Sequence, residues 1–241
     1  VQRMIITDHS LTYKMIEKLF VFAKQNGLAI GEVPRITELR NTRHKNLETY
    51  PIEVEDVLGR KQKVHKTGNY KLLKNKIILV TGAGGSIGFE LCKQINNFSP
   101  KKLILFEQNE YHLYQATEKL KSYTKVKSVL GDVRDEKKIF KIFKEHKPDI
   151  VFHSAALKHI TFAEDDPIEA INTNFLGTLN ILNACKEFCV SKMVFISTDK
   201  AVNPSTFMGA TKRLCEKYIQ QLDGKIATKL KIVRFGNVLG S

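Results

Sequence analysis

Three glycines at a fixed spacing are the clearest chemical signal in the sequence. Gly82, Gly85 and Gly88 directly follow an apolar run at 76–81 and open a segment with helical periodicity. Glycines at such positions allow a tight turn and a close approach of the backbone to a phosphate, and a helix N-terminus offers free N–H groups to an anion. The pattern predicts a site for the pyrophosphate of a dinucleotide. A glycine-rich turn without a ligand is the alternative.

Two acidic residues end the next two apolar runs. Glu107 lies about twenty residues beyond the last glycine, where a carboxylate can accept hydrogen bonds from the hydroxyls of an adenosine ribose. No arginine stands beside it to take a 2′-phosphate, so the position favours NAD over NADP. Asp132 follows the third run, where an adenine amino group would lie. The alternatives are a surface acid for Glu107 and a helix N-cap for Asp132.

Small residues follow the fourth apolar run. Ala155 and Ala156 leave room for a cofactor, and Lys158 comes just after them, at the carboxyl side of the predicted sheet, where ligands bind. We expect His153 to pack within its strand rather than to act in catalysis. Asn174 falls inside the next long helical segment, where a buried amide needs partners, so we predict that it bonds either the cofactor or the backbone.

Alternating strand and helix patterns must position these residues. The expected strands are 76–81, 102–106, 127–130, 150–153, 192–197 and 231–235, and the expected helices are 86–97, 110–123, 136–145, 168–188 and 208–222. Apolar strand runs separated by helices predict an α/β fold with a doubly wound parallel sheet, the Rossmann type, over residues 71–241.

The first part of the chain predicts a separate, smaller α/β segment. Residues 1–70 contain a strand at 3–7, a helix at 11–25 and a strand at 28–33, followed by polar sequence. A short amphipathic piece at 52–58 precedes a basic stretch at 60–70 that is typical of a linker. This unit is too small to bury a large core alone.

Composition excludes several classes of protein. The chain has 241 residues, 42% hydrophobic and 27% charged, which is ordinary for a globular protein. Its net charge of +14 comes from scattered lysines, so we do not expect nucleic-acid binding. The four cysteines have no zinc spacing, and we predict no metal site. No apolar run approaches the ~18 residues of a membrane span, and we expect no membrane contact by this chain and a cytoplasmic location.

Seven stretches together resemble a known family. They are 80–88, 131–135, 155–159, 174–178, 197–204, 208–212 and 234–240, and they cover residues 76–241 densely. The sequence resembles an extended short-chain dehydrogenase/reductase and, more closely, the CapD-type polysaccharide biosynthesis proteins, which are nucleotide-sugar 4,6-dehydratases. The resemblance implies NAD as cofactor, UDP-N-acetylglucosamine as substrate and a role in surface polysaccharide or glycan synthesis.

The resemblance also implies catalytic roles. Thr198 would polarise the C4 oxygen of the sugar, Asp199 would protonate the leaving C6 hydroxyl, Lys200 would be a base, and Lys212 would hold the nicotinamide ribose. Met208 stands where most of the superfamily has a tyrosine, and it has no proton to exchange. A surface ion pair is the alternative for Asp199 and Lys200.

The resemblance carries binding roles to matching positions as well. The cofactor-binding residues would be Gly82, Gly85, Ser86, Ile87, Gly88, Glu107, Asp132, Val133, Ala155, Ala156, Asn174 and Lys212. The substrate-binding residues would be Lys158 and Asn237.

The two ends of the sequence predict a fragment. The chain starts at a valine and stops just after a strand, so we expect the C-terminal substrate lobe to be missing and sugar turnover to be weak or absent, with NAD binding retained. Longer relatives carry membrane anchors before this segment, which would place a full-length protein at the cytoplasmic face of the membrane, and homo-oligomers are common among them. A nucleotide-sugar 4-epimerase and a non-catalytic dinucleotide-binding remnant remain as alternatives.

Overall fold

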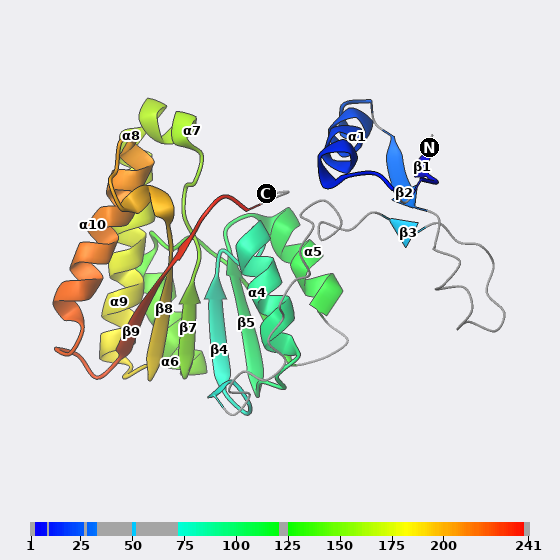
Figure 1. Ribbon diagram of the computed structural model, residues 1–241. Helices are drawn as coiled ribbons and strands as arrows, with labels where there is room; N and C mark the ends of the chain where they lie inside the picture. Colours follow the sequence, from blue (N-terminus) through cyan, green and yellow to red (C-terminus); the bar gives the residue numbers. More distant parts are fainter. Residues whose placement is uncertain are drawn as a thin grey trace. The chain divides into compact units, whose positions relative to one another are not determined.

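The computed structural model describes residues 3–8, 10–26, 28–32, 50–51, 72–120 and 125–238 (Figure 1). The chain divides into two compact units, Val1–Lys66 and Thr67–Ser241. The domain boundary that the sequence predicts, between residues 70 and 71, lies outside the described residues and stays a prediction. So do the predicted short piece at 52–58 and the linker at 60–70.

The first unit is a small three-stranded sheet with one helix. Its elements are β1 (Arg3–Ile6), α1 (Tyr13–Gln25), β2 (Ala29–Glu32) and β3 (Tyr50–Pro51). β1 and β2 run parallel, and β3 adds to β2 in the antiparallel direction. The predicted order of strand, helix and strand is confirmed. β3 was not expected, because two residues are too few to show an alternating pattern.

The second unit contains a six-stranded parallel sheet with helices on both faces (Figure 1). The strands lie in the order β6-β5-β4-β7-β8-β9. In chain order the elements are β4 (Ile77–Thr81), α4 (Ser86–Asn96), β5 (Lys102–Glu107), α5 (Glu110–Leu120), β6 (Val126–Leu130), α6 (Glu136–His146), β7 (Ile150–His153), α7 (Ile160–Asp165), α8 (Pro167–Ile171), a π-helical segment (Asn172–Leu176), α9 (Gly177–Glu187), β8 (Lys192–Thr198), a 3₁₀ turn (Asp199–Ala201), α10 (Phe207–Leu222) and β9 (Lys229–Phe235). The predicted doubly wound sheet is confirmed.

The core forms because successive strand residues point to opposite faces. Ile78 and Val80 of β4 belong to the apolar cluster under α4 and α5, whereas Leu79 belongs to the cluster under α6, α9 and α10. All three are fully buried. Burial of both sheet faces explains why the strands read as continuous apolar runs rather than as alternating ones.

Two features near the sheet differ from the sequence-based expectation. The six residues of α7 were not predicted, because so short a helix shows little periodicity. The predicted helix at 168–188 is interrupted by the π-helical segment. A Cβ on Gly177, just after this segment, would come within 2.6 Å of Val133, so the helix passes close to the loop after β6. Such π-helical turns often occur at functional sites.

The strand order fixes the place of a ligand site. From β4 the chain moves outward through β5 and β6, and then returns to add β7, β8 and β9 on the other side. The carboxyl ends of β4 and β7 therefore flank the point where the order reverses. In open α/β sheets, ligands bind in the crevice at this point.

Among the described residues, none of the helices combines the length and apolar character needed to cross a bilayer.

Candidate functional site

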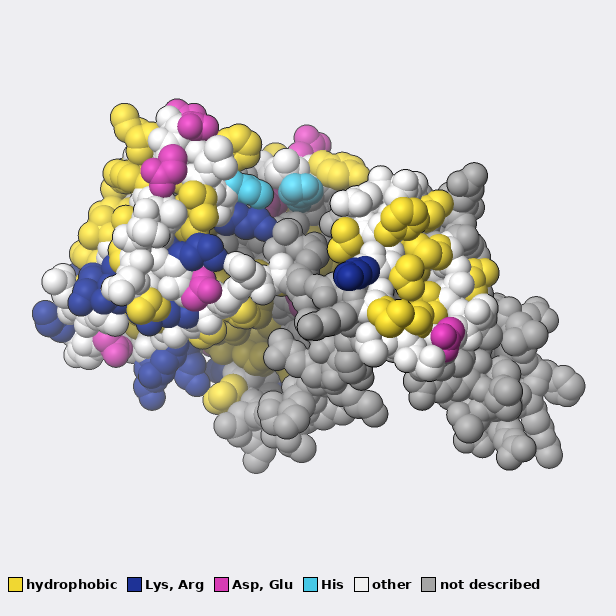
Figure 2. All heavy atoms as spheres, turned by 45° about the horizontal axis from the view of Figure 1, so that its top comes forward, with side chains coloured by type: hydrophobic (Ala, Val, Ile, Leu, Met, Phe, Trp, Pro, Cys, Tyr) yellow, Lys and Arg dark blue, Asp and Glu magenta, His cyan; other side chains and the backbone are white. Residues whose placement is uncertain are grey.

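A cavity of about 530 Å³ opens at the carboxyl ends of the strands. The predicted site residues that line it are Gly82, Gly85, Ser86, Ile87, Gly88, Glu107, Val133, Ala155, Ala156, Lys158, Thr198, Lys200, Met208, Lys212 and Asn237. Asp132, Asn174 and Asp199 are not among its lining residues. Figure 2 shows this face of the second unit, where histidine side chains lie beside lysine or arginine side chains.

The glycine loop has two kinds of glycine. Gly82 has a φ of +65°, and a Cβ there would come within 2.7 Å of the Ala155 nitrogen. A Cβ on Gly88 would overlap the Gly82 carbonyl oxygen. A Cβ on Gly85, by contrast, would meet only the Gly82 carbonyl oxygen, at an ordinary contact distance of 3.5 Å. Gly82 and Gly88 hold the loop together, and Gly85 leaves room for a ligand.

Helix α4 begins directly in this loop. Gly85 is its N-cap, and no side chain caps the first turn. The first turn also carries no acidic residue. Ser86 and Ile87 therefore present an open helix N-terminus to the cavity, where backbone N–H groups and the helix dipole favour an anion. The loop fits a pyrophosphate.

Glu107 is tied to the glycine loop. Its Oε2 accepts a hydrogen bond from the Gly84 backbone at 3.0 Å, and its Oε1 accepts from the Gln108 and Asn109 backbones at 2.9 and 3.0 Å. The side chain is buried and lines the cavity, so the alternative of a surface acid is wrong. Three N–H donors fix the carboxylate, which keeps further lone pairs that can accept hydrogen bonds from a ligand.

Asp132 lies beside the cavity and does not cap a helix. It accepts hydrogen bonds from the Arg134 backbone and Nε at 2.9 and 2.8 Å. Burial alone would raise the pKa of Asp132, but the bonds to Arg134 outweigh it and lower the pKa. The N-cap of α6 is Asp135, which accepts from the Lys138 backbone at 3.0 Å. The N-cap alternative for Asp132 is therefore wrong, and its adenine role stays a prediction.

Asn174 bonds the backbone. Its Oδ1 accepts from the Leu157 nitrogen at 2.8 Å, and its Nδ2 donates to the Leu157 oxygen at 3.1 Å and to Thr211 Oγ1 at 2.9 Å. The side chain is fully buried. It thus fixes Leu157, which lines the cavity, and the alternative of backbone bonding is confirmed.

We predict that Asn174→Ala lowers the free energy of unfolding by about 3 kcal/mol, because it leaves buried donors and acceptors without partners. Urea unfolding measures the loss, and the NADH dissociation constant of the folded variant should stay unchanged. Asn180→Ala is a control, because the half-buried Asn180 also donates to backbone carbonyls and should cost about 1 kcal/mol. Weaker NADH binding at unchanged stability would contradict this role.

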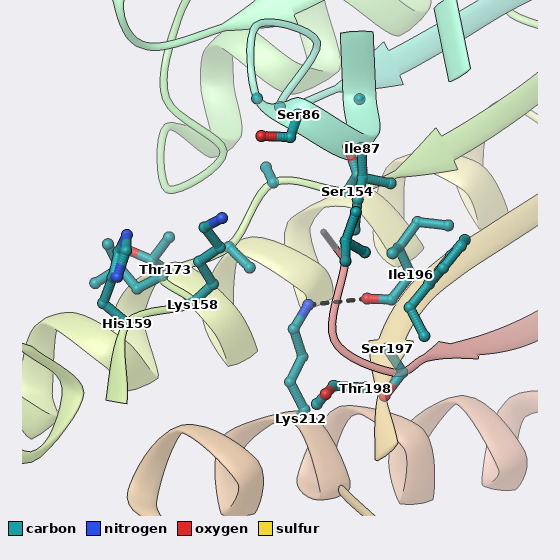
Figure 3. Close-up of a pocket in the computed structure, with 18 of the residues that line it drawn as sticks. Ser86, Ile87, Ser154, Lys158, His159, Thr173, Ile196, Ser197, Thr198 and Lys212 are labelled. Carbon is teal, nitrogen blue, oxygen red and sulfur yellow. Dashed lines mark hydrogen bonds between the residues drawn. The ribbon is translucent and has the colours of Figure 1, made fainter. Parts of the chain in front are cut away.

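Lys212 is a buried cation at the floor of the cavity. Its Nζ donates to the Ile196 carbonyl at 3.0 Å and lies 4.6 Å from the centre of the Phe195 ring. Burial lowers the pKa of Lys212 to about 8, although the negative forms of Cys215 and Glu216 oppose the shift. Figure 3 shows it between two sets of lining residues, Lys158, His159 and Thr173 on one side and Ile196, Ser197 and Thr198 on the other.

A short chain of hydrogen bonds joins the other predicted catalytic residues. Thr198 Oγ1 donates to Asp199 Oδ1 at 2.9 Å. The Lys200 ammonium donates to Asp199 Oδ1 at 3.3 Å and to Asn237 Oδ1 at 2.8 Å. The bonds from Thr198 and Lys200 lower the pKa of Asp199. The carboxylate form is therefore favoured, which suits a base better than the acid that we predicted.

Met208 lies one turn before Lys212 on α10 and lines the cavity. Its side chain packs with Ala163 and Ala170 in a small apolar cluster. The cavity wall therefore has the apolar side chain of Met208 at the position where most of the superfamily has a tyrosine base.

His153 packs within its strand, as predicted. Its Nδ1 lies 2.6 Å from Thr81 Oγ1, and its Nε2 lies 3.0 Å from Thr178 Oγ1. Burial, and then the charge of Lys212, lowers the pKa of His153 to about 3. The ring is neutral and serves as a link between β4, β7 and α9.

Several lining residues were not predicted. They are Phe106, Gln108, His112, Gly131, Ser154, Leu157, His159, Thr173, Ile196, Ser197, Phe235, Gly236 and Val238. Ser197, Gly236 and Val238 neighbour predicted residues and also lie in the family-like stretches 197–204 and 234–240, and either signal could have found them. For His112 on α5 no signal exists, because it reaches the cavity through the packing of α5 against the glycine loop.

The described side chains do not form a metal centre, since none of the groupings of three or more His, Cys, Asp or Glu suits an ion.

A parallel sheet with a glycine loop and a cavity at its switch point defines a Rossmann-type domain of the extended short-chain dehydrogenase/reductase kind. Residues 78–241 match the family described as "Polysaccharide biosynthesis protein". The chain belongs to this family, which confirms the resemblance.

Three curated relatives illustrate the similarity. The chain is 40% identical to a capsular polysaccharide biosynthesis protein CapD of Staphylococcus aureus, over 100% of this chain and 41% of the relative. It is 35% identical to a UDP-N-acetylglucosamine 4,6-dehydratase (inverting) of Campylobacter jejuni, over 70% of this chain and 51% of the relative. It is 37% identical to a UDP-glucose 4-epimerase of Rickettsia canadensis, over 69% of this chain and 50% of the relative.

A solved structure shares the fold. The X-ray structure of Pen from Bacillus thuringiensis matches with a TM-score of 0.67 at 34% identity, and the match covers 70% of this chain and 52% of that one. The chain thus spans about half, or less, of the length of these similar proteins.

Proposed function

We propose that the protein is an NAD-dependent nucleotide-sugar 4,6-dehydratase of the UDP-N-acetylglucosamine type that serves surface polysaccharide or glycan synthesis. One observation carries the proposal: a single cavity is lined by the glycine loop and by Thr198, Lys200 and Lys212. The relative named UDP-N-acetylglucosamine 4,6-dehydratase supports the reaction type, and the relative named CapD supports a role in polysaccharide synthesis.

The residues present fit a dinucleotide. Gly85, which lines the cavity without a side chain, and the uncapped start of α4 suit the pyrophosphate. Glu107 would accept hydrogen bonds from the adenosine ribose, and a 2′-phosphate would meet its negative charge. The ring systems of the dinucleotide would be enclosed by Val133, Ala155 and Ala156. When bound, NAD would supply a reversible hydride acceptor that takes the hydride of the sugar carbon C4 and returns it to C6 after the loss of water, so that NAD ends in its starting state.

Residues that line the cavity, together with Asp199 beside them, would handle the protons. Thr198 would hold the C4 oxygen, and the Lys212 ammonium would hold the ribose and add positive charge. Asp199, favoured as a carboxylate, would take the C5 proton, and Lys200, bonded to Asp199 and Asn237, would give a proton to the leaving C6 hydroxyl. This division is the reverse of the one implied by the resemblance. Elimination removes one water across C5 and C6. Lys158 would face the anionic substrate at the rim.

We predict that Asp199→Asn and Lys200→Met each lower the rate of dehydration by about 100-fold, because each removes a proton-transfer group. Stopped assays of product formation measure the rates. NADH affinity should stay unchanged in Asp199→Asn, because the Asp199 side chain does not line the cavity. Unchanged turnover in both variants would contradict the proposed roles.

A 4-epimerase is the second candidate, because a relative of similar identity is a UDP-glucose 4-epimerase. Met208 argues against it, since it occupies the position of the tyrosine that an epimerase of this superfamily would use. A non-catalytic remnant is the third candidate. The contacts of Lys212 with Ile196 and Phe195 argue against it, because burial of a cation costs free energy that a remnant has no reason to keep.

Mass analysis of the reaction separates the candidates. The protein is incubated with NAD and UDP-N-acetylglucosamine in deuterated water. A dehydratase gives a product lighter by one water and labelled at C5, whereas an epimerase conserves the mass. Unchanged sugar nucleotide in the presence of bound NAD would fit both a remnant and a chain that needs the rest of its relatives' length, and the same assay on the full-length protein separates these two. A homo-oligomer and a cytoplasmic location remain predictions, which sedimentation and cell fractionation can test.

A further inference from the structure

The most heavily bonded charged side chain beside the site is one that the proposed chemistry does not use. Glu216 on α10 is completely buried. Its Oε1 accepts from Ser197 Oγ at 2.7 Å and from Arg234 Nε at 2.8 Å. Its Oε2 accepts from Arg234 Nη2 at 2.6 Å and from Arg213 Nη1 at 3.2 Å. The carboxylate thus joins one helix to two strands.

Ion pairs on a buried carboxylate are weak evidence for stability alone. Removing the Glu216 carboxylate from water is costly even though the Arg234 and Arg213 side chains stay partly exposed, and well-packed apolar residues of the same volume are often as stable. The bidentate geometry of Arg234 on Glu216, however, fixes position and angle as well as distance. The geometry of the Glu216–Arg234 pair therefore favours a role in holding neighbouring groups in place over a role in stability alone.

Two partners of Glu216 lie on strands whose ends line the cavity. Ser197 and Arg234 face each other across β8 and β9 in the sheet register. Ser197 lines the cavity and directly precedes Thr198, and Arg234 lies three residues before Asn237, the partner of Lys200. The two strand ends that carry these groups therefore converge on one carboxylate.

On the helix side, Glu216 stands one turn after Lys212. Lys212 binds the carbonyl of Ile196, and Glu216 binds the hydroxyl of the next residue, Ser197. Lys212 and Glu216 thus fasten the helix to consecutive residues of β8. A shift of α10 along β8 would break both contacts together.

We propose that Glu216 is a positioning residue: through Ser197 and Arg234 it holds α10, and with it the ammonium of Lys212, against the ends of β8 and β9. The inference deepens the proposed function and rests on it for the ligand that Lys212 contacts. Glu216 touches no reacting atom itself, because its oxygens are bonded to Ser197, Arg213 and Arg234.

The charge of Glu216 has a second effect. Burial would raise its own pKa, but the hydrogen bonds from Arg234, Ser197 and Arg213 outweigh burial and keep the pKa low. The carboxylate therefore stays charged and favours the charged form of Lys212. The other titratable groups near Lys212 are Cys215 on the same helix, whose pKa burial raises, and His153 on β7, which is neutral.

The test is a titration of NADH fluorescence with the chain from about pH 6 to about pH 10, a range that spans the ordinary and lowered lysine pKa values. In the wild type, affinity should fall with a midpoint near the pKa of Lys212, about 8. In Glu216→Gln the midpoint should move down by about one pH unit, because an opposite charge has been removed. Glu187→Gln removes an exposed acid from α9 and should leave the midpoint in place.

Glu216→Asp tests the positioning separately. It keeps the charge but is too short to reach both strands, so the midpoint should hold while affinity falls by about tenfold, the loss of one charged hydrogen bond. Arg234→Lys repeats this test from the strand side, because a lysine cannot bond both oxygens. These two variants decide the question if Glu216→Gln does not fold.

The outcomes separate the two proposals. A wild-type chain that binds no NADH overturns the proposed function. Binding by the wild type, with the midpoint unmoved in Glu216→Gln or with full affinity in Glu216→Asp and Arg234→Lys, overturns the positioning role. A lower melting temperature with an unchanged pH profile would show that Glu216 is structural only.

Discussion

Lys212→Met is expected to reduce dehydration by about 1000-fold or more, within the range for loss of a positioned charged group. The ammonium lies on the cavity floor, held by the Ile196 carbonyl and the Phe195 ring. Methionine fills a similar volume but offers neither a donor nor a charge. NADH affinity should fall by about tenfold, because a charged hydrogen bond is lost. Product formation and NADH titration measure the two effects.

The free energy of unfolding of Lys212→Met should not fall, although activity and NADH affinity do. Burial lowers the pKa of Lys212 from 10.5 to about 8, so between these values the unfolded chain binds more protons than the folded one. Burial of the ammonium lowers the free energy of unfolding by its full amount below about pH 8, and this loss disappears as the pH rises toward 10.5. Lys212→Met removes that cost, so at neutral pH its free energy of unfolding should equal or exceed that of the wild type.

Lys217→Met is the matched control, since Lys217 is exposed on the same helix. This variant should keep the activity of the wild type and the pH dependence of its free energy of unfolding. Full turnover by Lys212→Met, or a stability profile parallel to the wild type between pH 8 and 10.5, would contradict the role assigned to Lys212.

Gly88→Ala is expected to abolish measurable NADH binding, a loss of about 100-fold or more for an overpacked site. The new Cβ would overlap the Gly82 carbonyl oxygen and come within 2.9 Å of Ser154 Oγ. The glycine loop must then move away from β7, and the free energy of unfolding should fall by about 3 kcal/mol. NADH titration and urea unfolding measure these losses.

Gly85→Ala separates binding from folding. Its Cβ would have no neighbour closer than 3.5 Å, and its φ of −73° suits alanine. Stability should change by less than about 1 kcal/mol, while NADH binding weakens because the methyl group occupies the ligand's space. Normal binding by Gly85→Ala would show that the open side of the loop does not hold the cofactor.

Much of this arrangement could be predicted from sequence because it depends on local pattern. The glycine spacing after a strand located the loop, and the alternation of apolar runs gave the doubly wound sheet. Glu107 could be placed because strand ends of a parallel sheet share one edge. Motif and position were enough to locate a residue whose place depends only on the strand or loop that carries it.

The rest depends on contacts between distant residues. Glu216 and Arg234 are 18 positions apart, and they meet only because β9 lies beside β8. The capping role fell to Asp135 rather than Asp132 because turn geometry, not residue type, selects the N-cap. Asn174 was left open between cofactor and backbone, since the π-helical segment that turns it toward Leu157 has no sequence signature. Such pairings follow from the three-dimensional packing.

Calorimetric titration of the chain with NAD and with NADP tests the central claim most directly. The cavity is expected to bind one NAD, and to bind NADP at least about tenfold more weakly, because the fixed carboxylate of Glu107 would face the 2′-phosphate. Gly85→Ala should weaken NAD binding in the same experiment. Absence of NAD binding, or tighter binding of NADP, would contradict the claim.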